Sequence, residues 1–222
     1  MAIRTHRLTF PISADEARTL RAGDLVVIDG EIVVTAGMPT HERLLGVLDG
    51  AEPAPMELHG ASLFHLGSYS QEGEGGRFEV LYINPTTSTR FNPYMPRLIP
   101  GFQWHAVGGK GGLDERCAQA MQEVGCVYLS FLGGGCTLLS EAVKEVLEVG
   151  WSDMLTHYRL VRLRVEGLGP ATVGIDAHGR SLYAEEQATA RERLPALMGA
   201  LEEARRRPLP AHPERKIGNV DE

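Results

Sequence analysis

Hydrophobic and polar positions in the first quarter of the chain predict a short helix followed by paired strands. The motif SADE, with Ser13 as N-cap and a glutamate three residues later, has the pattern of a capping box and predicts a helix to about Arg21. In the stretch DLVVIDGEIVVTAG, two β-branched runs flank Asp29-Gly30. That dipeptide between apolar runs predicts a hairpin with a two-residue turn.

The middle of the chain predicts a helix, two strands and a loop. Pro39 suits the first turn of a helix through HERLLGVL, which Gly50 ends. The runs SLFHLG and FEVLYIN predict strands, and the glycine-rich stretch SQEGEGG between them predicts a turn. Three prolines then predict a long loop without regular structure, namely Pro93, Pro96 and Pro100.

In the second half, strand and helix patterns alternate. DERCAQAMQEVG and TLLSEAVKEVLEV have helical spacing, while VYLSFL and RLVRLRVEG predict strands. TVGIDAHGRSLYA predicts a hairpin that turns at Asp176–Gly179, and a charged helix broken near Pro195 follows. The simplest architecture is α/β, with one layered domain over residues 1–207 and a loose C-terminal tail over 208–222.

Composition and charge narrow the class of protein. The 222 residues are 43% hydrophobic and 23% charged, which is ordinary for a globular protein that buries a sizeable core. The net charge of −7 argues against a nucleic-acid partner, which usually requires a basic face. No apolar run approaches the roughly 20 residues that span a bilayer, and no secretory signal is recognisable. We therefore expect no membrane association and a cytoplasmic location.

Three cysteines occur without a CxxC pair, at positions 117, 126 and 136. Their odd number and spacing do not predict a disulfide framework or a zinc site. Three thiolates can in principle bind an iron–sulfur cluster, which leaves that alternative open. We expect all three to be small, buried apolar residues, and no metal ligand is predicted in this chain.

The stretch INPTTSTRFNPYMP is the first candidate for chemistry. It places four hydroxyl side chains, starting with Thr86 and Thr87, directly before Arg90. A guanidinium binds a carboxylate or phosphate through two parallel hydrogen bonds, and hydroxyls add short-range bonds. The stretch therefore predicts a site for a small anion. The alternative is a polar turn with a solvated arginine.

Three further candidates are weaker when taken singly. Lys110 lies in GGKGG within VGGKGGL, a flexible glycine cluster in which a ligand can approach backbone amides and the ammonium, or else a mobile surface loop. In FLGGGCT, a strand–glycine–helix junction that starts at Phe131, the glycines either present amides to an anion or, as we favour, allow close packing. His41, near the start of a helix, is more often structural than catalytic.

Taken in order, TAGMPTHERL, PTTSTR, GGKGG and VYLSFLGGGCTLLSEAVKEV, with the later IDAHGRSLY, resemble one family. This is the C-terminal domain of class I, iron–sulfur-dependent fumarases, which is also the β subunit of L(+)-tartrate dehydratases. The resemblance covers about Leu20 to Tyr183. It includes the threonine pair before Arg90 and a lysine twenty positions later, Lys110.

The resemblance implies a swivelling β/β/α fold and a division of labour between subunits. A partner α subunit would bind a four-iron four-sulfur cluster, whose open iron acts as Lewis acid on a small hydroxy-dicarboxylic acid. This chain would act as the β subunit of an oligomeric hydro-lyase of the fumarate hydratase or tartrate dehydratase type. By the same resemblance, Arg90, Lys110 and Thr87 would bind substrate. Thr86 would lie near the proton transfer, and His41 would orient nearby groups in the catalytic site.

One departure from the family pattern concerns the substrate. Where the family reads TARDAAH, this chain reads TAGMPTH, so Gly37 and Met38 replace an arginine and an acidic residue. Either the substrate differs, or Arg43 substitutes, or activity is lost. A positive φ angle at Gly37 is a structural alternative. The function of a different class that stays open is a non-catalytic dicarboxylate-binding or regulatory subunit.

Overall fold

The computed structural model describes residues 3–73 and 77–206, and contacts divide the chain into two units, Met1–Ala184 and Glu185–Glu222. The strands of the first unit are β1 Thr5–Phe10, β2 Leu25–Val34, β3 Ser62–Phe64, β4 Leu66–Glu72, β5 Phe78–Pro85, β6 Ala106–Gly109, β7 Val127–Ser130, β8 Val143–Gly150 and β9 Leu160–Ile175. Its helices are α1 Ala14–Thr19, α2 Met38–Leu48, α3 Met95–Phe102, α4 Glu115–Val124 and α5 Cys136–Glu141, with short 3-10 helices η2 Ser88–Phe91 and η3 Thr156–Tyr158. Helix α6, Leu182–Arg206, begins at the end of the first unit and forms the described part of the second.

The large sheet has the order β1-β2-β3-β6-β7-β9-β8, with a further pairing of β9 to β2. Strands β1, β2, β3, β6 and β7 pair in parallel. The sixteen-residue β9 runs antiparallel to β7, β2 and β8. Because β9 pairs with both β7 and β2, strands β2, β3, β6, β7 and β9 close into a ring. The α/β layered architecture predicted from the sequence is confirmed.

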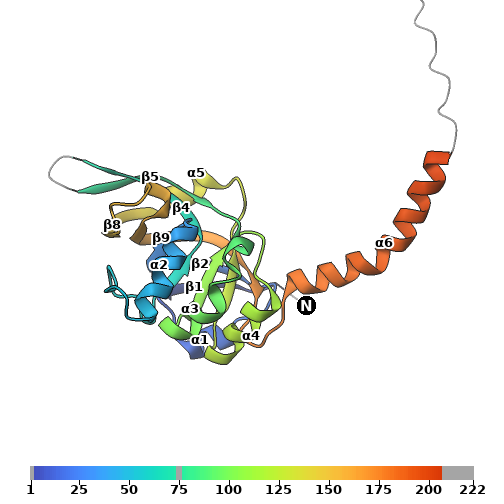
Figure 1. Cartoon of the computed structure of the whole chain (residues 1–222), viewed down its shortest axis with the longest axis horizontal. Helices are drawn as coiled ribbons and strands as arrows, with labels where there is room; N and C mark the ends of the chain where they lie inside the picture. Colours follow the sequence, from blue (N-terminus) through green and yellow to red (C-terminus); the bar gives the residue numbers. More distant parts are fainter. Residues whose placement is uncertain (1–2, 74–76, 207–222) are drawn as a thin grey trace, which may run out of the picture. The chain divides into compact units, whose positions relative to one another are not determined.

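Two hydrophobic clusters fill the space on either side of the strands. One contains Ala17 of α1 and the following Leu20 with side chains from β2, β7 and β9. In the other, helices α2, α3 and α4 pack on strand residues such as Val107 and Tyr128, and Figure 1 shows these helices gathered beside the strands. Burial of a helix stripe against a sheet face is the main stabilising term in such a layer. The packing of α2, α3 and α4 therefore helps to hold the strands, and the residues at their ends, in place.

The hairpin predicted at Asp29-Gly30 is wrong, because β2 runs straight through the dipeptide. The Asp29 carboxylate accepts two hydrogen bonds from the Arg7 guanidinium of β1 and one from the Gly167 amide of β9. Gly30 has φ +96° beside the backbone of Phe10, and the β9 pairing shifts register twice just before it, on either side of Ile28. Contacts with β1 and β9 therefore hold Asp29-Gly30 as an irregularity inside β2.

The helix predicted over TLLSEAVKEVLEV is also largely wrong. Helix α5 ends at Glu141, and the remainder is strand β8. Two register shifts against β9 turn valines spaced three apart, Val143, Val146 and Val149, toward the core. On the other side of β8, Glu145 pairs with Arg164 of β9 and Glu148 pairs with Arg162. A three-residue apolar spacing that looks helical is thus compatible with a bulged strand.

Prolines mislead the prediction in two other places. Helix α3 replaces the predicted loop, with Pro96 in its first turn, where the missing amide hydrogen has no helical partner. Four apolar side chains at helical spacing are buried along it, namely Met95, Leu98, Ile99 and Phe102. Helix α6 continues through Pro195, so the predicted break there is wrong.

Near the end of the first unit, the predicted turn at Asp176–Gly179 is present, but the predicted hairpin is not. The Gly179 amide donates to the Asp176 carbonyl, which closes the predicted turn. The returning segment forms a single bridge, between Ile175 and Ser181, before α6 begins. The predicted tail at 208–222 lies outside the described residues. Within the described chain, no helix combines the length and apolar character needed to cross a membrane.

Candidate functional site

The carboxyl ends of three parallel strands bring the predicted residues to one edge of the sheet. β3 leads into His65, β6 leads into Lys110, and β2 leads through Thr35 to Gly37 at the start of α2. Side chains that follow parallel strands meet at the same edge, which is where open α/β sheets commonly bind ligands. The residues predicted from two separate motifs, TAGMPTH and GGKGG, therefore share one region with His65.

Backbone hydrogen bonds join the threonine–arginine stretch, residues 86–90, to the GGKGG motif at residues 108–112, which we call the lysine loop. Thr87 and Lys110 form a parallel bridge outside the named strands. The Lys110 amide donates to the Thr86 carbonyl over 3.0 Å, and the Ser88 amide donates to the Lys110 carbonyl over 2.8 Å. Thr86, Thr87 and Lys110 are therefore direct neighbours, although more than twenty residues separate them in the sequence.

The glycines around Lys110 permit this close approach. Gly109 has φ +155°, and a Cβ atom there would lie 2.9 Å from His65 Cβ and 3.1 Å from the Thr86 carbonyl oxygen. All four residues of β6 are buried. The flexible glycine cluster predicted for this segment is therefore wrong in its first half, where the chain is a packed strand.

Arg90 and Lys110 are available cations. Arg90 lies on η2 and is exposed, and Lys110 is half-buried. Within residues 3–73 and 77–206, neither the guanidinium of Arg90 nor the ammonium of Lys110 has a hydrogen bond or ion pair. Two unneutralised cations beside a pair of half-buried threonines can bind a carboxylate.

His41 occupies a different environment, because its ring is fully buried and both ring nitrogens have protein partners. Nδ1 lies 2.6 Å from the Gly37 carbonyl oxygen, and Nε2 lies 3.3 Å from Nε2 of His65. The ring stacks on Phe91 with centroids 4.0 Å apart. Burial lowers the pKa of His41 to about 4, so the ring is neutral near pH 7. This geometry suits a residue that orients its neighbours.

Gly37 is closed in by its neighbours, and its backbone does not require glycine. Its φ of −91° is open to any residue, so the positive φ considered from the sequence is wrong. A Cβ atom at Gly37 would lie 2.8 Å from Tyr158 Cβ and would also collide with the Thr40 hydroxyl. That hydroxyl donates to the Tyr158 carbonyl. Tyr158 and Thr40 therefore fill the space that a side chain at position 37 would enter first.

Arg43 does not replace the missing arginine, so that alternative is wrong. Its guanidinium makes three hydrogen bonds to the Glu52 carboxylate and one to Asp153. It also lies 4.4 Å from the centroid of the Trp151 ring. These contacts hold Arg43 away from the lysine loop.

The glycine junction after β7 is open to solvent. Gly134 has φ +82° and no atom within 4 Å of a Cβ position, so close packing is wrong as the reason for glycine there. A Cβ atom on Gly133 would lie 3.6 Å from Lys110 Cδ. The exposed junction therefore borders the Lys110 side chain.

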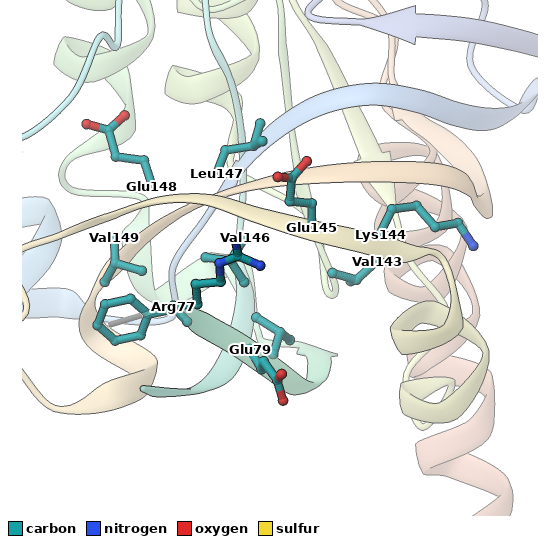
Figure 2. Close-up of a pocket in the computed structure, with 11 residues that line it drawn as sticks. Arg77, Glu79, Val143, Lys144, Glu145, Val146, Leu147, Glu148 and Val149 are labelled. Carbon is teal, nitrogen blue, oxygen red and sulfur yellow. The ribbon is translucent and has the colours of Figure 1, made fainter. Parts of the chain in front are cut away.

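A hollow of about 810 Å³ lies elsewhere, between β8 and the start of β5. Figure 2 shows Glu145 and Glu148 on β8, with Arg77 and Glu79 coming from the β5 side. None of the predicted site residues lines it. Its mixed charges and valines belong to two strand edges, so we place the candidate site at the lysine loop.

The cysteines do not gather into a ligand set. Cys117 and Cys126 are fully buried, with their thiols directed at the carbonyls of Asn92 and Val127, and burial raises the pKa of both. Cys136 is half-buried beside Ser140. Across the described ranges, no group of three histidine, cysteine or acidic residues could hold a metal ion. The described side chains of this chain therefore do not fit an iron–sulfur cluster.

Replacing Cys117 and Cys126 by alanine is expected to cost stability and to leave cluster content unchanged. Removal of two buried thiols should lower the free energy of unfolding by about 1–3 kcal/mol in total, as measured by urea denaturation. Iron per complex with the cluster-bearing partner that the resemblance implies should stay at the unsubstituted value, with Cys136→Ala as the control at a half-buried position. Iron loss in proportion to the cysteines removed would contradict the space-filling role.

Comparison with known proteins decides the family. The family described as "Fumarase C-terminus" matches residues 3–186. This chain belongs to that family. The L(+)-tartrate dehydratase subunit beta of Escherichia coli strain K12 is 31% identical over 186 residues, covering 84% of this chain and 90% of that protein. A Geobacillus stearothermophilus protein named "Putative fumarate hydratase class I" is 33% identical over 196 residues, 86% of this chain. The match spans only 36% of the Geobacillus protein.

The family membership confirms the resemblance seen in the ordered motifs. Sequence reasoning missed three residues at this edge, His65, Ser88 and Tyr128, which lie buried between the predicted positions. A histidine directly after an apolar strand was the available signal for His65. Nothing in the local pattern distinguished Ser88 from its three hydroxyl neighbours.

Proposed function

We propose that this chain is the β subunit of a heteromeric hydro-lyase that adds water to, or removes it from, a small hydroxy-dicarboxylic acid. The observation that carries the proposal is the junction of Thr86, Thr87 and Lys110, with Arg90 on the adjoining 3-10 helix. The relatives named as tartrate dehydratase β subunits support it, since this chain covers most of their length.

In this proposal Arg90 and Lys110 bind a substrate carboxylate. Removal of a proton beside a carboxylate builds negative charge on it, and preorganised cations stabilise that charge. Thr87 adds a hydroxyl next to Lys110, and Thr86 lies near the proton that is transferred. His41 acts through its hydrogen bonds and does not contact the acid itself. The chain's own groups thus bind, orient and stabilise charge.

The partner and cofactor follow from the family and from the chemistry that this chain lacks. The proposed partner is an α subunit that carries a four-iron four-sulfur cluster, because the three cysteines here are not arranged as ligands. The proposed location is the cytoplasm. The proposed assembly is an oligomer of both subunits.

The isolated chain is expected to show no turnover of fumarate, malate or L(+)-tartrate. The full-length chain would be purified anaerobically, incubated with iron and sulfide, and assayed beside the assembled complex. Turnover by the chain alone at the rate of the complex would contradict the division of labour.

A second candidate is a non-catalytic subunit that binds dicarboxylates. The closed surroundings of Gly37 favour it, since the family arginine has no room there. A stable complex that binds the acid without turnover would identify this alternative.

A further inference from the structure

A continuous chain of buried hydrogen bonds crosses the candidate site beneath its surface. Its four side chains are all fully buried, and they come from α2, the end of β3, η2 and β7. We call this set the buried polar chain, and in order it consists of the Gly112 amide, Tyr128, Ser88, His65, His41 and the Gly37 carbonyl. It links the lysine loop to the first turn of α2.

The carbonyl end of the buried polar chain sets the direction of the bonds in it. A carbonyl can only accept, so His41 must carry its proton on Nδ1, 2.6 Å from the Gly37 oxygen. An amide can only donate, so the Tyr128 oxygen accepts from Gly112 over 3.3 Å. The Tyr128 hydroxyl donates to Ser88 over 2.8 Å.

The directions of the middle hydrogen bonds follow from the Gly37 end of the buried polar chain. A neutral His41 with its proton on Nδ1 has a bare Nε2, so His65 carries its proton on Nε2 and donates it to His41 over 3.3 Å. The Nδ1 of His65 is then bare and accepts from Ser88 over 2.8 Å, while Ser88 accepts from Tyr128. Every donor meets an acceptor only when both imidazoles are neutral. Burial lowers the pKa of both rings, which agrees with that state.

The backbone of the same residues holds the anion-binding segments. The His65 amide donates to the Gly108 carbonyl, and the His65 carbonyl accepts from the Thr86 amide. The Ser88 amide donates to the carbonyl of Lys110. Gly112, where the buried polar chain ends, lies two residues beyond Lys110. Movement of any member would therefore shift Lys110 or the stretch that leads to Arg90.

We propose that His65, Ser88 and Tyr128 are positioning residues that fix the Thr86–Arg90 stretch and the lysine loop relative to the first turn of α2. Their role in catalysis rests on the proposed function. The hydrogen-bond chain itself does not, and it can be tested on the full-length chain alone.

The first test reads the tautomers. Nitrogen-15 NMR of the imidazole rings at neutral pH is expected to show His41 protonated on Nδ1 and His65 protonated on Nε2, both neutral. The reverse tautomer at either ring, or an imidazolium, would overturn the buried polar chain.

The second test removes hydrogen bonds from the buried polar chain and measures amide hydrogen exchange in the lysine loop. Ser88→Ala and Tyr128→Phe are expected to raise amide hydrogen exchange at Lys110 and Gly112 by about tenfold or more, since a buried partner is lost. The matched control is Ser62→Ala, because Ser62 is equally buried and its hydroxyl has no partner among the described residues. It should change exchange at Lys110 and Gly112 less than about twofold. Equal exchange in Ser88→Ala and Ser62→Ala would overturn the positioning role.

The third test uses the assembled complex, at a temperature where each variant remains folded. Ser88→Ala and Tyr128→Phe are expected to lower kcat by about tenfold with a smaller change in KM, because misplaced groups stabilise the transition state less well. Unchanged kcat in an active complex would remove the catalytic part of the inference and leave the hydro-lyase function standing. A wild-type complex without any turnover would instead contradict the proposed function, and exchange at Lys110 would still decide the positioning.

Discussion

Replacing Arg90 by lysine in the assembled complex is expected to lower kcat/KM at least about tenfold, or about 1.4 kcal/mol of transition-state stabilisation. A lysine keeps the charge but cannot form the two parallel hydrogen bonds of a guanidinium with a carboxylate. Lys110→Ala should act at least as strongly, because it removes one of the two cations beside the developing charge. Steady-state kinetics with the acid that the complex turns over would measure both.

Matched surface substitutions separate this effect from general loss of stability. Arg97→Lys alters an exposed arginine of α3 that pairs with Asp49, and Lys144→Ala removes an exposed lysine of β8. Both controls should keep kcat/KM within about twofold of the unsubstituted complex. Full activity of Arg90→Lys and Lys110→Ala would show that no anion binds at the lysine loop.

Gly37→Ala is expected to destabilise the chain by about 1–3 kcal/mol, because the new methyl group must displace Tyr158 and Thr40. Gly37→Arg should be at least as costly, and it should not improve turnover of malate. The matched control is Gly46→Ala in the same helix, where the nearest atom to a new Cβ lies 3.8 Å away. That change should stabilise by about 0.5–1 kcal/mol, since alanine is the better helix former.

Thermal unfolding of the three variants, with malate KM measured in the complex, would check this pair of opposite effects. A melting temperature for Gly37→Ala at or above that of Gly46→Ala would show that Tyr158 moves aside freely. A fall in malate KM with Gly37→Arg would show that the site accepts the family arginine after all.

The sequence predicted the α/β class from the alternation of strand and helix patterns. It predicted the capping box at Ser13 and the helix at Pro39 because a capping side chain and a proline in the first turn act locally. It failed where neighbouring strands override local preference. Asp29-Gly30 has the composition of a turn, yet β1 and β9 hold it inside a strand. The valines of β8 have helical spacing, and only the bulges against β9 turn them inward.

The candidate site was predictable in part, from the order of motifs in the resemblance. Thr86, Thr87, Arg90 and Lys110 follow from it, and the bridge between Thr87 and Lys110 brings two of those motifs together. The buried polar chain was not predictable, because its members are distant in sequence and each is unremarkable alone. The surroundings of Gly37 depend on Tyr158, more than a hundred residues away.

The most direct measurement is a titration of this chain into a fixed amount of the proposed cluster-bearing α subunit, with dehydration of L(+)-tartrate and malate followed anaerobically. The proposed function predicts that turnover of at least one hydroxy-dicarboxylic acid appears only when both subunits are present and saturates as the chain is added. Full turnover by the α subunit alone, or a stable complex that turns over neither acid nor fumarate, would contradict it.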